Sequence, residues 1–340
     1  AGGSPETDIL ALRSYRQMLI LARRSAFTGQ ELRAARRFAE ERRFDLVYMP
    51  DLRSSEVNRF NVLPEPSYSE ACRSLLDAPD LGAWARTYTF DVRPPIDDRP
   101  FFGHFFRWRQ MPGLLAAAGH TWQPFGGAGY LVLVVLLGCA VLASVLLILL
   151  PLALKQGASL VQEGGGRVLA YFAFLGLGYL SVEIPLMQRF GLFLGHPTWS
   201  MAVVLGTLLS FSGIGSRFSA HVPLHAALIG VPALVGGYVL GLPVLFEWAL
   251  AFPLWARVVV SVAALAPVGR LMGMPFPKGI ALVRRPSWIA WAWASNGVLS
   301  VIASILAALI SLGWGLSAVL WIGAGSYLAA MAVRPRSPAR

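Results

Sequence analysis

The sequence predicts a mainly α-helical, multi-pass membrane domain that is preceded by the C-terminal part of an α/β Rossmann-like domain. Residues 128–154 contain no charged side chain. As a helix this stretch would extend about 40 Å, which exceeds the roughly 30 Å of a bilayer's hydrocarbon core. Similar apolar stretches continue toward the C-terminus, whereas residues 1–127 are rich in Arg, Asp and Glu. We therefore expect a polar part over 1–127, a membrane domain over 128–333 and a basic tail over 334–340.

The charge distribution separates these parts further. Most of the net charge of +11 falls after residue 127, where the acidic residues are Glu163, Glu183 and Glu247. Basic loops beside a membrane attract lipid headgroups. The polar part is nearly balanced in charge, which argues against nucleic acid as a partner. Cys72 and Cys139 lie in different parts and lack CxxC spacing, so we expect neither a disulfide nor a cysteine metal site.

The polar part begins with a strand, a helix and a second strand. Residues 18–22 (MLILA) suit a buried strand, and Thr28 and Glu31 have capping-box spacing before a helix that reaches about Arg43. Residues 44–49 suit a second strand, so the order predicts one parallel βαβ unit. So small a parallel sheet cannot be covered on both faces, and we expect its other strands in a missing N-terminal half of the domain. A helix over 67–77 and a strand over 87–92 should follow.

Seven stretches of the membrane domain are apolar enough to be spans. Tryptophan near their ends is typical of a membrane interface, and Trp122, Trp199, Trp248, Trp288 and Trp314 have such positions. Pro253 and Pro267 fall in or beside the fifth stretch, which suits a broken or re-entrant helix. Gly237 and Gly241 have the spacing of close helix packing. The expected spans are 128–154, 167–188, 199–216, 222–244, 249–269, 288–312 and 315–333.

Orientation in the membrane follows from the basic loops. With seven spans, these loops lie on the side opposite the polar part, and the positive-inside rule then places the polar part outside the cytoplasm. If the polar part uses cytosolic metabolites, however, it must lie in the cytoplasm. We expect the polar part in the cytoplasm, with residues 246–285 crossing the membrane a different number of times.

Glu183 is the first candidate for a functional residue. A carboxylate inside a span is costly unless it is protonated, paired or in contact with water. Pro185 follows and interrupts the helical hydrogen bonds. We expect Glu183 to face other helices within reach of Arg189, Arg217 or Asn296, either as a structural ion pair or as a cation site. Asn296 also suits an interhelical hydrogen bond.

Asp97 and Asp98 form a second candidate site, in the connector before the first span. They suit a pair of functional carboxylates or a turn before Pro100, and the turn is favoured. His221 and His225 have i, i+4 spacing, but no third ligand lies near them in the sequence. We therefore expect no metal site.

Several segments together resemble a known family. IDDRPFFGHFF precedes the first span, and LGLGYLSVEIPLMQRFGLFLGHPTWSMAVVLGTLLSFSGIGS, MGMPFPKGIAL and WAWASNGVLSVIAS follow. These segments resemble the C-terminal portion of the bacterial spermidine synthase-like integral membrane proteins, in which a Rossmann-type domain is fused to membrane helices. The resemblance implies a location in the bacterial inner membrane and covers nearly the whole chain.

The resemblance also implies a function linked to polyamine or other S-adenosylmethionine-dependent group transfer. The family's Gly-rich cofactor loop and catalytic Asp residues belong to the missing half, so no catalytic residue can be assigned here. We expect no cofactor in this chain and no activity from it alone, with S-adenosylmethionine or its decarboxylated form bound by a full-length parent. Two alternatives stay open: a transporter-like module that moves a cation past Glu183, and a purely structural membrane anchor.

Overall fold

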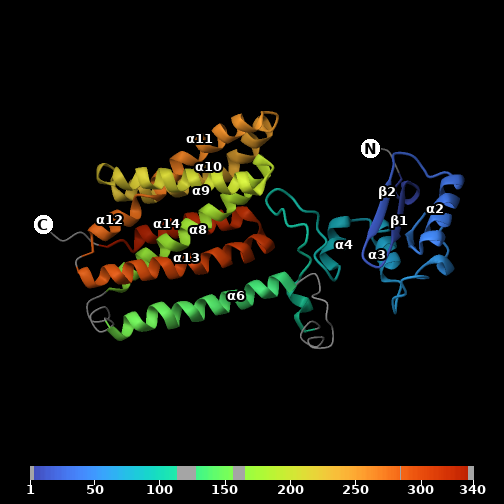
Figure 1. Cartoon of the computed structure of the whole chain (residues 1–340), viewed down its shortest axis with the longest axis horizontal. Helices are drawn as coiled ribbons and strands as arrows, with labels where there is room; N and C mark the ends of the chain where they lie inside the picture. The colour runs from blue at the N-terminus through green and yellow to red at the C-terminus, as the bar shows by residue number, and fades with distance from the viewer. Residues whose placement is uncertain (1–3, 113–127, 156–164, 284, 336–340) are drawn as a thin grey trace. The chain divides into compact units, whose positions relative to one another are not determined.

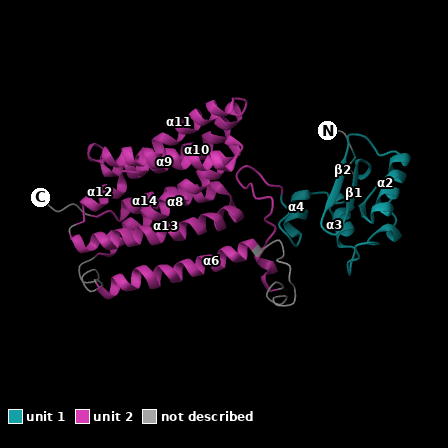
Figure 2. Cartoon of the chain, in the orientation of Figure 1, with its two compact units in different colours: residues 1–93 teal, residues 94–340 magenta. Residues whose placement is uncertain are grey.

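The computed structural model describes residues 4–112, 128–155, 165–283 and 285–335 and divides into two compact units. Unit 1 covers residues 1–93 and unit 2 covers residues 94–340 (Figure 2). The division falls at Pro94, so the described connector residues 94–112 belong to the helical unit. Trp122 and the end of the basic tail, residues 336–340, lie outside the described residues.

Unit 1 contains a three-stranded sheet that differs from the expected one. Its strands are β1 (Ile9–Arg13), β2 (Met18–Ala22) and β3 (Asp45–Tyr48), in the order β2-β1-β3, and both pairings are antiparallel. The expected parallel pairing was wrong because β1 lies between the other two strands. The short loop after β1, in which the Ser14 amide donates to the Gln17 carbonyl at 2.8 Å, closes an antiparallel hairpin. The described residues thus show a small antiparallel sheet and no Rossmann-like domain.

Burial within this sheet also departs from expectation. Every residue of β2 is exposed, so the prediction of a buried strand there was wrong. The buried strand is β1, where Leu10 and Leu12 pack against Leu32 and Ala39 of α2 (Gly29–Arg42). β2 pairs with β1 on one side only and forms an edge of the sheet.

The helices of unit 1 follow local signals. The expected capping box starts α2: the Thr28 Oγ accepts a hydrogen bond from the Glu31 amide at 3.4 Å, and a Glu31 carboxylate oxygen accepts one from the Thr28 amide at 2.8 Å. The helix expected over 67–77 is confirmed as α3 (Ser67–Leu76). Residues 87–92 form no strand. A helix that was not expected, α4 (Leu81–Thr87), precedes them and is capped by Asp80, which accepts a hydrogen bond from the Gly82 amide at 2.8 Å. The short helices α1 (Pro5–Asp8) and η1 (Ser54–Glu56) complete the unit.

Unit 2 is helical, and the membrane prediction is supported. Six of its described helices are long and apolar enough to cross a membrane, while α14 has 17 residues and is shorter. Each of the seven expected spans coincides with a helix. The described elements are η2 (Trp108–Gln110), α6 (Ala128–Ser144) with the π-helical turn η3 (Val145–Leu149), α8 (Gly166–Leu194), α9 (Pro197–Arg217), η4 (Ser219–His221), α10 (Leu224–Ala249), α11 (Leu254–Met272), α12 (Pro275–Ala281), α13 (Pro286–Trp314) and α14 (Leu316–Ala332). The fifth span is α11, which continues through Pro267 and is not broken.

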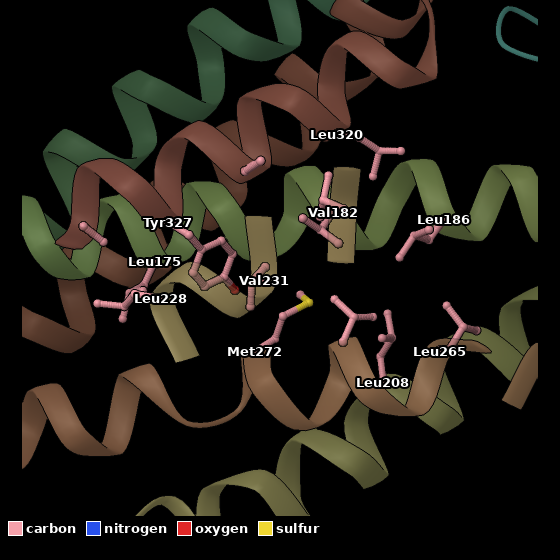
Figure 3. Packing of buried hydrophobic residues seen from close by; sticks show 14 of the residues in the cluster. Leu175, Val182, Leu186, Leu208, Leu228, Val231, Leu265, Met272, Leu320 and Tyr327 are labelled. Carbon is pink, nitrogen blue, oxygen red and sulfur yellow. The ribbon is translucent and has the colours of Figure 1, made fainter. Parts of the chain in front are cut away.

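The helix α8 lies at the centre of this unit and packs against α9, α13 and α14. Figure 3 shows Val182 and Leu186 of α8 facing Leu265 and Met272 of α11, next to Tyr327 of α14. In contrast, α6 lies along α13 (Figure 1), and most of its side chains are exposed. An apolar, exposed helix of this length suits contact with lipid.

Close helix contacts occur at glycines other than the expected pair. A Cβ at Gly176 would collide with the Asn296 carbonyl of α13, and a Cβ at Gly178 would lie 3.0 Å from the Tyr327 ring. Gly237 and Gly241 face open space instead, so the packing role predicted for them was wrong.

Candidate functional site

The helix ends at one side of unit 2 surround a cavity of about 560 Å³. The C-terminal ends of α8 and α10 and the first turn of α14 form its walls, together with part of the connector. Its lining residues are Asp97, Asp98, Arg189, Leu192, Phe193, Val239, Leu242, Pro243, Phe246, Glu247, Leu250 and Ser317. Pockets of this size typically bind small molecules.

Asp98 and Arg189 form an ion pair at this cavity. The Arg189 Nη2 atom donates to the Asp98 Oδ1 atom and to the Ser317 hydroxyl, each at 2.6 Å. The Asp98 Oδ1 atom also accepts from the Ser317 amide at 2.9 Å and from the Ser317 hydroxyl at 2.7 Å. The pair thus joins the connector, α8 and the first turn of α14.

Asp98 also caps the start of α14. Its backbone carbonyl accepts a hydrogen bond from the Leu316 amide at 2.7 Å, and its side chain accepts from the next amide, that of Ser317. First-turn amides have no partner within their own helix, and a carboxylate there is favoured by the helix dipole. The turn favoured for Asp97 and Asp98 is present, since the Arg99 amide donates to the Ile96 carbonyl at 2.7 Å. This turn places Asp98 at the start of α14, a helix that is far away in the sequence.

Gly315 makes this approach possible. The residue separates α13 from α14 and has a φ of +91°, a conformation that favours glycine. A Cβ at this position would also collide with the Asp98 carboxylate. The junction between the last two helices and the position of Asp98 therefore depend on the same residue.

The remaining charges of the cavity differ in their environment. Asp97 and Glu247 are exposed, and neither forms a hydrogen bond or ion pair with any residue that the structure describes. Arg189 is 7% exposed. The lining thus combines three carboxylates with one guanidinium, which leaves a net negative charge.

Aromatic and aliphatic side chains form the rest of the wall. Phe193 of α8 and Phe246 of α10 stack with ring centroids 4.4 Å apart. The Phe193 carbonyl accepts a hydrogen bond from the Arg257 Nη1 atom at 2.7 Å, which ties the start of α11 to the end of α8. Leu242 is buried beside these rings. The cavity therefore has an apolar wall as well as charged groups.

Glu183 lies outside the cavity lining, in the middle of α8. Tyr179, one helical turn earlier in α8, is its polar neighbour. The Tyr179 hydroxyl lies 3.5 Å from the Ser212 hydroxyl, which donates to the Gly269 carbonyl at 3.0 Å. Glu183 is half-buried, and in the part of the chain that the structure describes no Lys or Arg forms an ion pair with it.

The partners proposed for Glu183 have other roles. Arg189 is occupied by Asp98, and Arg217 is exposed at the end of α9. The Asn296 side chain donates to the Phe172 carbonyl at 3.2 Å, which is the interhelical hydrogen bond that the sequence suggested as an alternative. The structure therefore unites Asp98 with Arg189 and does not bring Arg217 or Asn296 to either acidic site.

Among the described residues, no three His, Cys, Asp or Glu side chains gather as metal ligands, and this includes His221 and His225. Glu247 was not chosen from the sequence as a site residue, although an acid beside Trp248 at the end of an apolar stretch was a usable signal.

Comparison of the chain with protein-family models, curated proteins and solved structures finds no match.

Proposed function

We propose that unit 2 is a membrane-embedded module that binds a small organic cation in the cavity at the ends of α8, α10 and α14. The observation that carries this proposal is a pair of carboxylates, Asp97 and Glu247, that have no partner among the described residues and line a partly apolar cavity. A carboxylate accepts strong hydrogen bonds from an ammonium group. The Phe193 and Phe246 side chains can bury the carbon chain of the same ligand.

The surrounding tryptophans support a position at the membrane interface. Trp199, Trp248, Trp255 and Trp314 are exposed, and all lie near the helix ends that surround the cavity. Exposed tryptophan is enriched at the level of the lipid headgroups. Trp288 was expected in this belt but is buried at the other end of the bundle. The interface position gives a ligand access from water or from the headgroup layer.

A polyamine is the first ligand to test, because the resemblance to spermidine synthase-like proteins implies polyamine chemistry. Ammonium groups separated by methylene units match carboxylates beside an apolar wall. In this proposal the chain binds the cation and does not catalyse a reaction.

Transport of the same cation is a second candidate function. The observation that favours it is Glu183, a carboxylate in the middle of α8 that has Tyr179 one turn away and, within the described residues, no basic partner. Acidic residues inside spans often mark ion or substrate pathways. Arg189 and Glu183 lie on the same helix, so the cavity and the inner carboxylate could act in sequence.

We further propose the bacterial inner membrane as the location, with the cavity on the side away from the cytoplasm. The opposite ends of the helices carry the basic residues Lys155, Arg167, Arg217, Arg270, Lys278, Arg285 and Arg334. By the positive-inside rule that end faces the cytoplasm. The polar residues before Pro94 then lie outside it, unlike the expectation from cytosolic metabolites.

The binding proposal is tested by calorimetry with spermidine on the full chain in lipid nanodiscs. We expect measurable binding that weakens about tenfold or more in Asp97→Asn/Glu247→Gln, because each lost charged hydrogen bond is worth about 1.5–3 kcal/mol. Glu70→Gln, on the exposed surface of α3, is the matched control and should bind as the wild type does. Equal affinity in all three proteins would refute the role of the cavity carboxylates.

The transport candidate needs a separate measurement. Proteoliposomes that contain the wild type should accumulate labelled spermidine, and Glu183→Gln should abolish the flux while leaving binding at the cavity unchanged. Binding without flux in the wild type would exclude transport. Neither binding nor flux would leave the membrane anchor as the remaining function.

A further inference from the structure

We infer that the end of unit 2 opposite the cavity holds a discrete site for one anionic phospholipid, formed by the ends of α9 and α11. Arg217 is the last residue of α9, Arg270 lies in the last turn of α11, and both residues are exposed. This site is independent of the proposed cation site. It differs from a general attraction of basic loops to headgroups, because it needs two particular guanidinium groups and an apolar surface beside them.

Close backbone packing brings these two helix ends together. A Cβ at Gly215 of α9 would collide with the Arg270 carbonyl, and a Cβ at Gly273 would collide with the Ser212 carbonyl of α9. The Ser212 hydroxyl also donates a hydrogen bond to the Gly269 carbonyl of α11 at 3.0 Å. The ends of α9 and α11 are therefore held against each other, and each of them carries an exposed arginine.

The Arg270 side chain reaches back to the end of α9. Its Cζ atom lies 6.0 Å from the centroid of the Phe218 ring, and Phe218 directly follows Arg217 in the chain. Contact with the face of an aromatic ring orients a guanidinium without neutralising its charge. The positive charge of Arg270 is thus placed at the residue next to Arg217.

Neither arginine has an acidic partner. The acidic residues in the described part of unit 2 are Asp97, Asp98 and Glu247 at the cavity and Glu183 in the middle of α8. Neither Arg217 nor Arg270 forms a hydrogen bond or ion pair through its side chain with a residue that the structure describes. The dipole at a helix C-terminus favours a cation, so both arginines remain charged there without an acid.

Two exposed guanidinium groups without protein partners suit an anion from outside the chain. A guanidinium presents its N–H donors in a planar fork that matches the oxygens of a phosphate. The phosphate of a phospholipid headgroup is the anion that is available at the end of a membrane span. A headgroup with a net negative charge fits best, because it adds no positive group beside the two arginines.

The apolar surface next to the arginines favours a lipid over a soluble phosphate. Ile214 is 42% exposed and Phe218 is 43% exposed. The Phe218 amide donates to the Ile214 carbonyl at 3.1 Å, so the two residues lie one helical turn apart on the same side of α9. Since α9 is long and apolar enough to cross a membrane, an acyl chain can cover this surface while the phosphate binds the arginines.

The test measures lipid binding to the full chain in detergent by native mass spectrometry. The two probes are phosphatidylglycerol and phosphatidylcholine with identical acyl chains, which differ in the net charge of the headgroup. We expect the first phosphatidylglycerol to bind about tenfold more tightly than the first phosphatidylcholine, because choline brings a positive charge to the two arginines. Equal affinity of the two lipids would overturn the inference and leave the cation proposal intact.

A pair of double substitutions locates the site. Arg217→Gln/Arg270→Gln should remove the preference for phosphatidylglycerol. The matched control, Lys155→Gln/Arg334→Gln, removes two exposed basic residues from the same end of the unit and should retain the preference. An equal loss in both variants would show a diffuse attraction by net charge and would refute a discrete site.

A single substitution keeps the test informative if the double variant fails to fold. The Arg217 side chain is exposed and contacts no described partner, so Arg217→Gln should keep the melting temperature of the wild type and still weaken the preference. An unchanged preference in Arg217→Gln would exclude Arg217 from the site. Glycerol 3-phosphate carries the phosphate without acyl chains and should not displace the bound lipid. Displacement by this probe would assign the site to a soluble phosphate and contradict the lipid.

Discussion

At the scale of single residues, the main feature of this protein is the position of Asp98. The Asp98 carboxylate accepts hydrogen bonds from Arg189 and Ser317, and its backbone carbonyl accepts one from the Leu316 amide. These partners belong to two helices, α8 and α14, that lie far from Asp98 in the sequence. Its neighbour Asp97 faces the cavity and, within the described residues, makes no such contact. Adjacent aspartates thus have different tasks, one in stability and one in the proposed binding of a cation.

Substitution of each aspartate separates these tasks. Asp98→Ala should lower the free energy of unfolding by about 1–3 kcal/mol, because it removes the cap of α14 and leaves Arg189 buried without its partner. Asp97→Ala is the matched control and should change it by less than about 0.5 kcal/mol. The apparent melting temperature in detergent measures both, and equal melting temperatures would contradict the assigned role of Asp98.

The environment of Asp45 predicts how the stability of unit 1 depends on pH. Burial alone would raise the pKa of Asp45, but its carboxylate accepts hydrogen bonds from the Phe60 amide at 2.8 Å and the Asn61 amide at 2.9 Å, and the pKa is held below its usual value. A carboxyl group with a depressed native pKa stabilises the fold above its unfolded pKa of about 3.9, and this contribution is lost as pH falls through the native pKa. Hydrogen exchange of residues 44–61, corrected for intrinsic rates, should therefore show protection at neutral pH that declines in acid.

The Asn variant tests this assignment. Asp45→Asn should show weaker protection at neutral pH and a smaller decline in acid. The control Glu65→Gln removes an exposed carboxylate of the same unit and should behave as the wild type. An unchanged acid response in Asp45→Asn would show that another carboxylate controls it.

At the scale of secondary-structure elements, α8 organises unit 2. It contacts α13 and α14 through glycines, while Ser295 and Asn296 of α13 donate hydrogen bonds to its Leu169 and Phe172 carbonyls. Small residues allow helices to approach closely in a membrane, where lipid removes the usual hydrophobic drive for association. The same helix carries Glu183 and Arg189, so its packing also positions both candidate sites.

The close approach of α13 to α8 at Gly176 predicts that replacing glycine by alanine has a different effect on stability at Gly176 and at Gly237. Gly176→Ala should destabilise the protein by about 1–3 kcal/mol, because the added methyl group would push α13 away at Asn296. Gly237→Ala meets open space in α10 and should be neutral or should stabilise by up to about 1 kcal/mol through helix propensity. Thermal unfolding in detergent distinguishes the two. Equal destabilisation by both would argue against the α8–α13 contact.

At the scale of the whole molecule, charge divides the helical unit into two unlike ends. The end with the cavity carries Asp97, Asp98 and Glu247 together with arginines such as Arg189 and Arg257, whereas among the described residues the helix ends at the other side carry basic residues and no acidic one. The Arg167 side chain donates to the Ala332 carbonyl at 3.2 Å, which ties the start of α8 to the end of α14 at the basic end. This asymmetry underlies the proposed orientation.

Single-cysteine labelling tests the orientation in intact cells. In a chain with Cys72 and Cys139 replaced by Ser, Ala220→Cys lies at the basic end and Ala251→Cys at the cavity end, and both native residues are exposed. A membrane-impermeant maleimide should label Ala251→Cys from outside and should reach Ala220→Cys only after permeabilisation. The reverse pattern would place the cavity in the cytoplasm, as the use of cytosolic metabolites would require.

Features that depend on neighbours in the sequence were predicted well. The seven apolar stretches became helices because length and apolarity are properties of each stretch alone. The start of α2 followed from Thr28 and Glu31, since a capping box joins residues only three positions apart. The helix at Ser67–Leu76 belongs to the same class. The sequence by itself therefore determined the apolar helices of the membrane part and two helices of the polar part, α2 and α3.

The tertiary structure decided which of these elements and charges meet. The strand order β2-β1-β3 depends on β1, a short apolar strand that pairs with both of the others. Nothing in its own residues indicates that it lies at the centre of the sheet. Asp98 and Arg189 are 91 positions apart, and only the packing of the connector against α8 and α14 pairs them. The exposure of Glu247 beside them depends on the same packing. A cavity is a property of surfaces that converge from distant segments, so its residues can be nominated from a sequence, but their association is set by the fold.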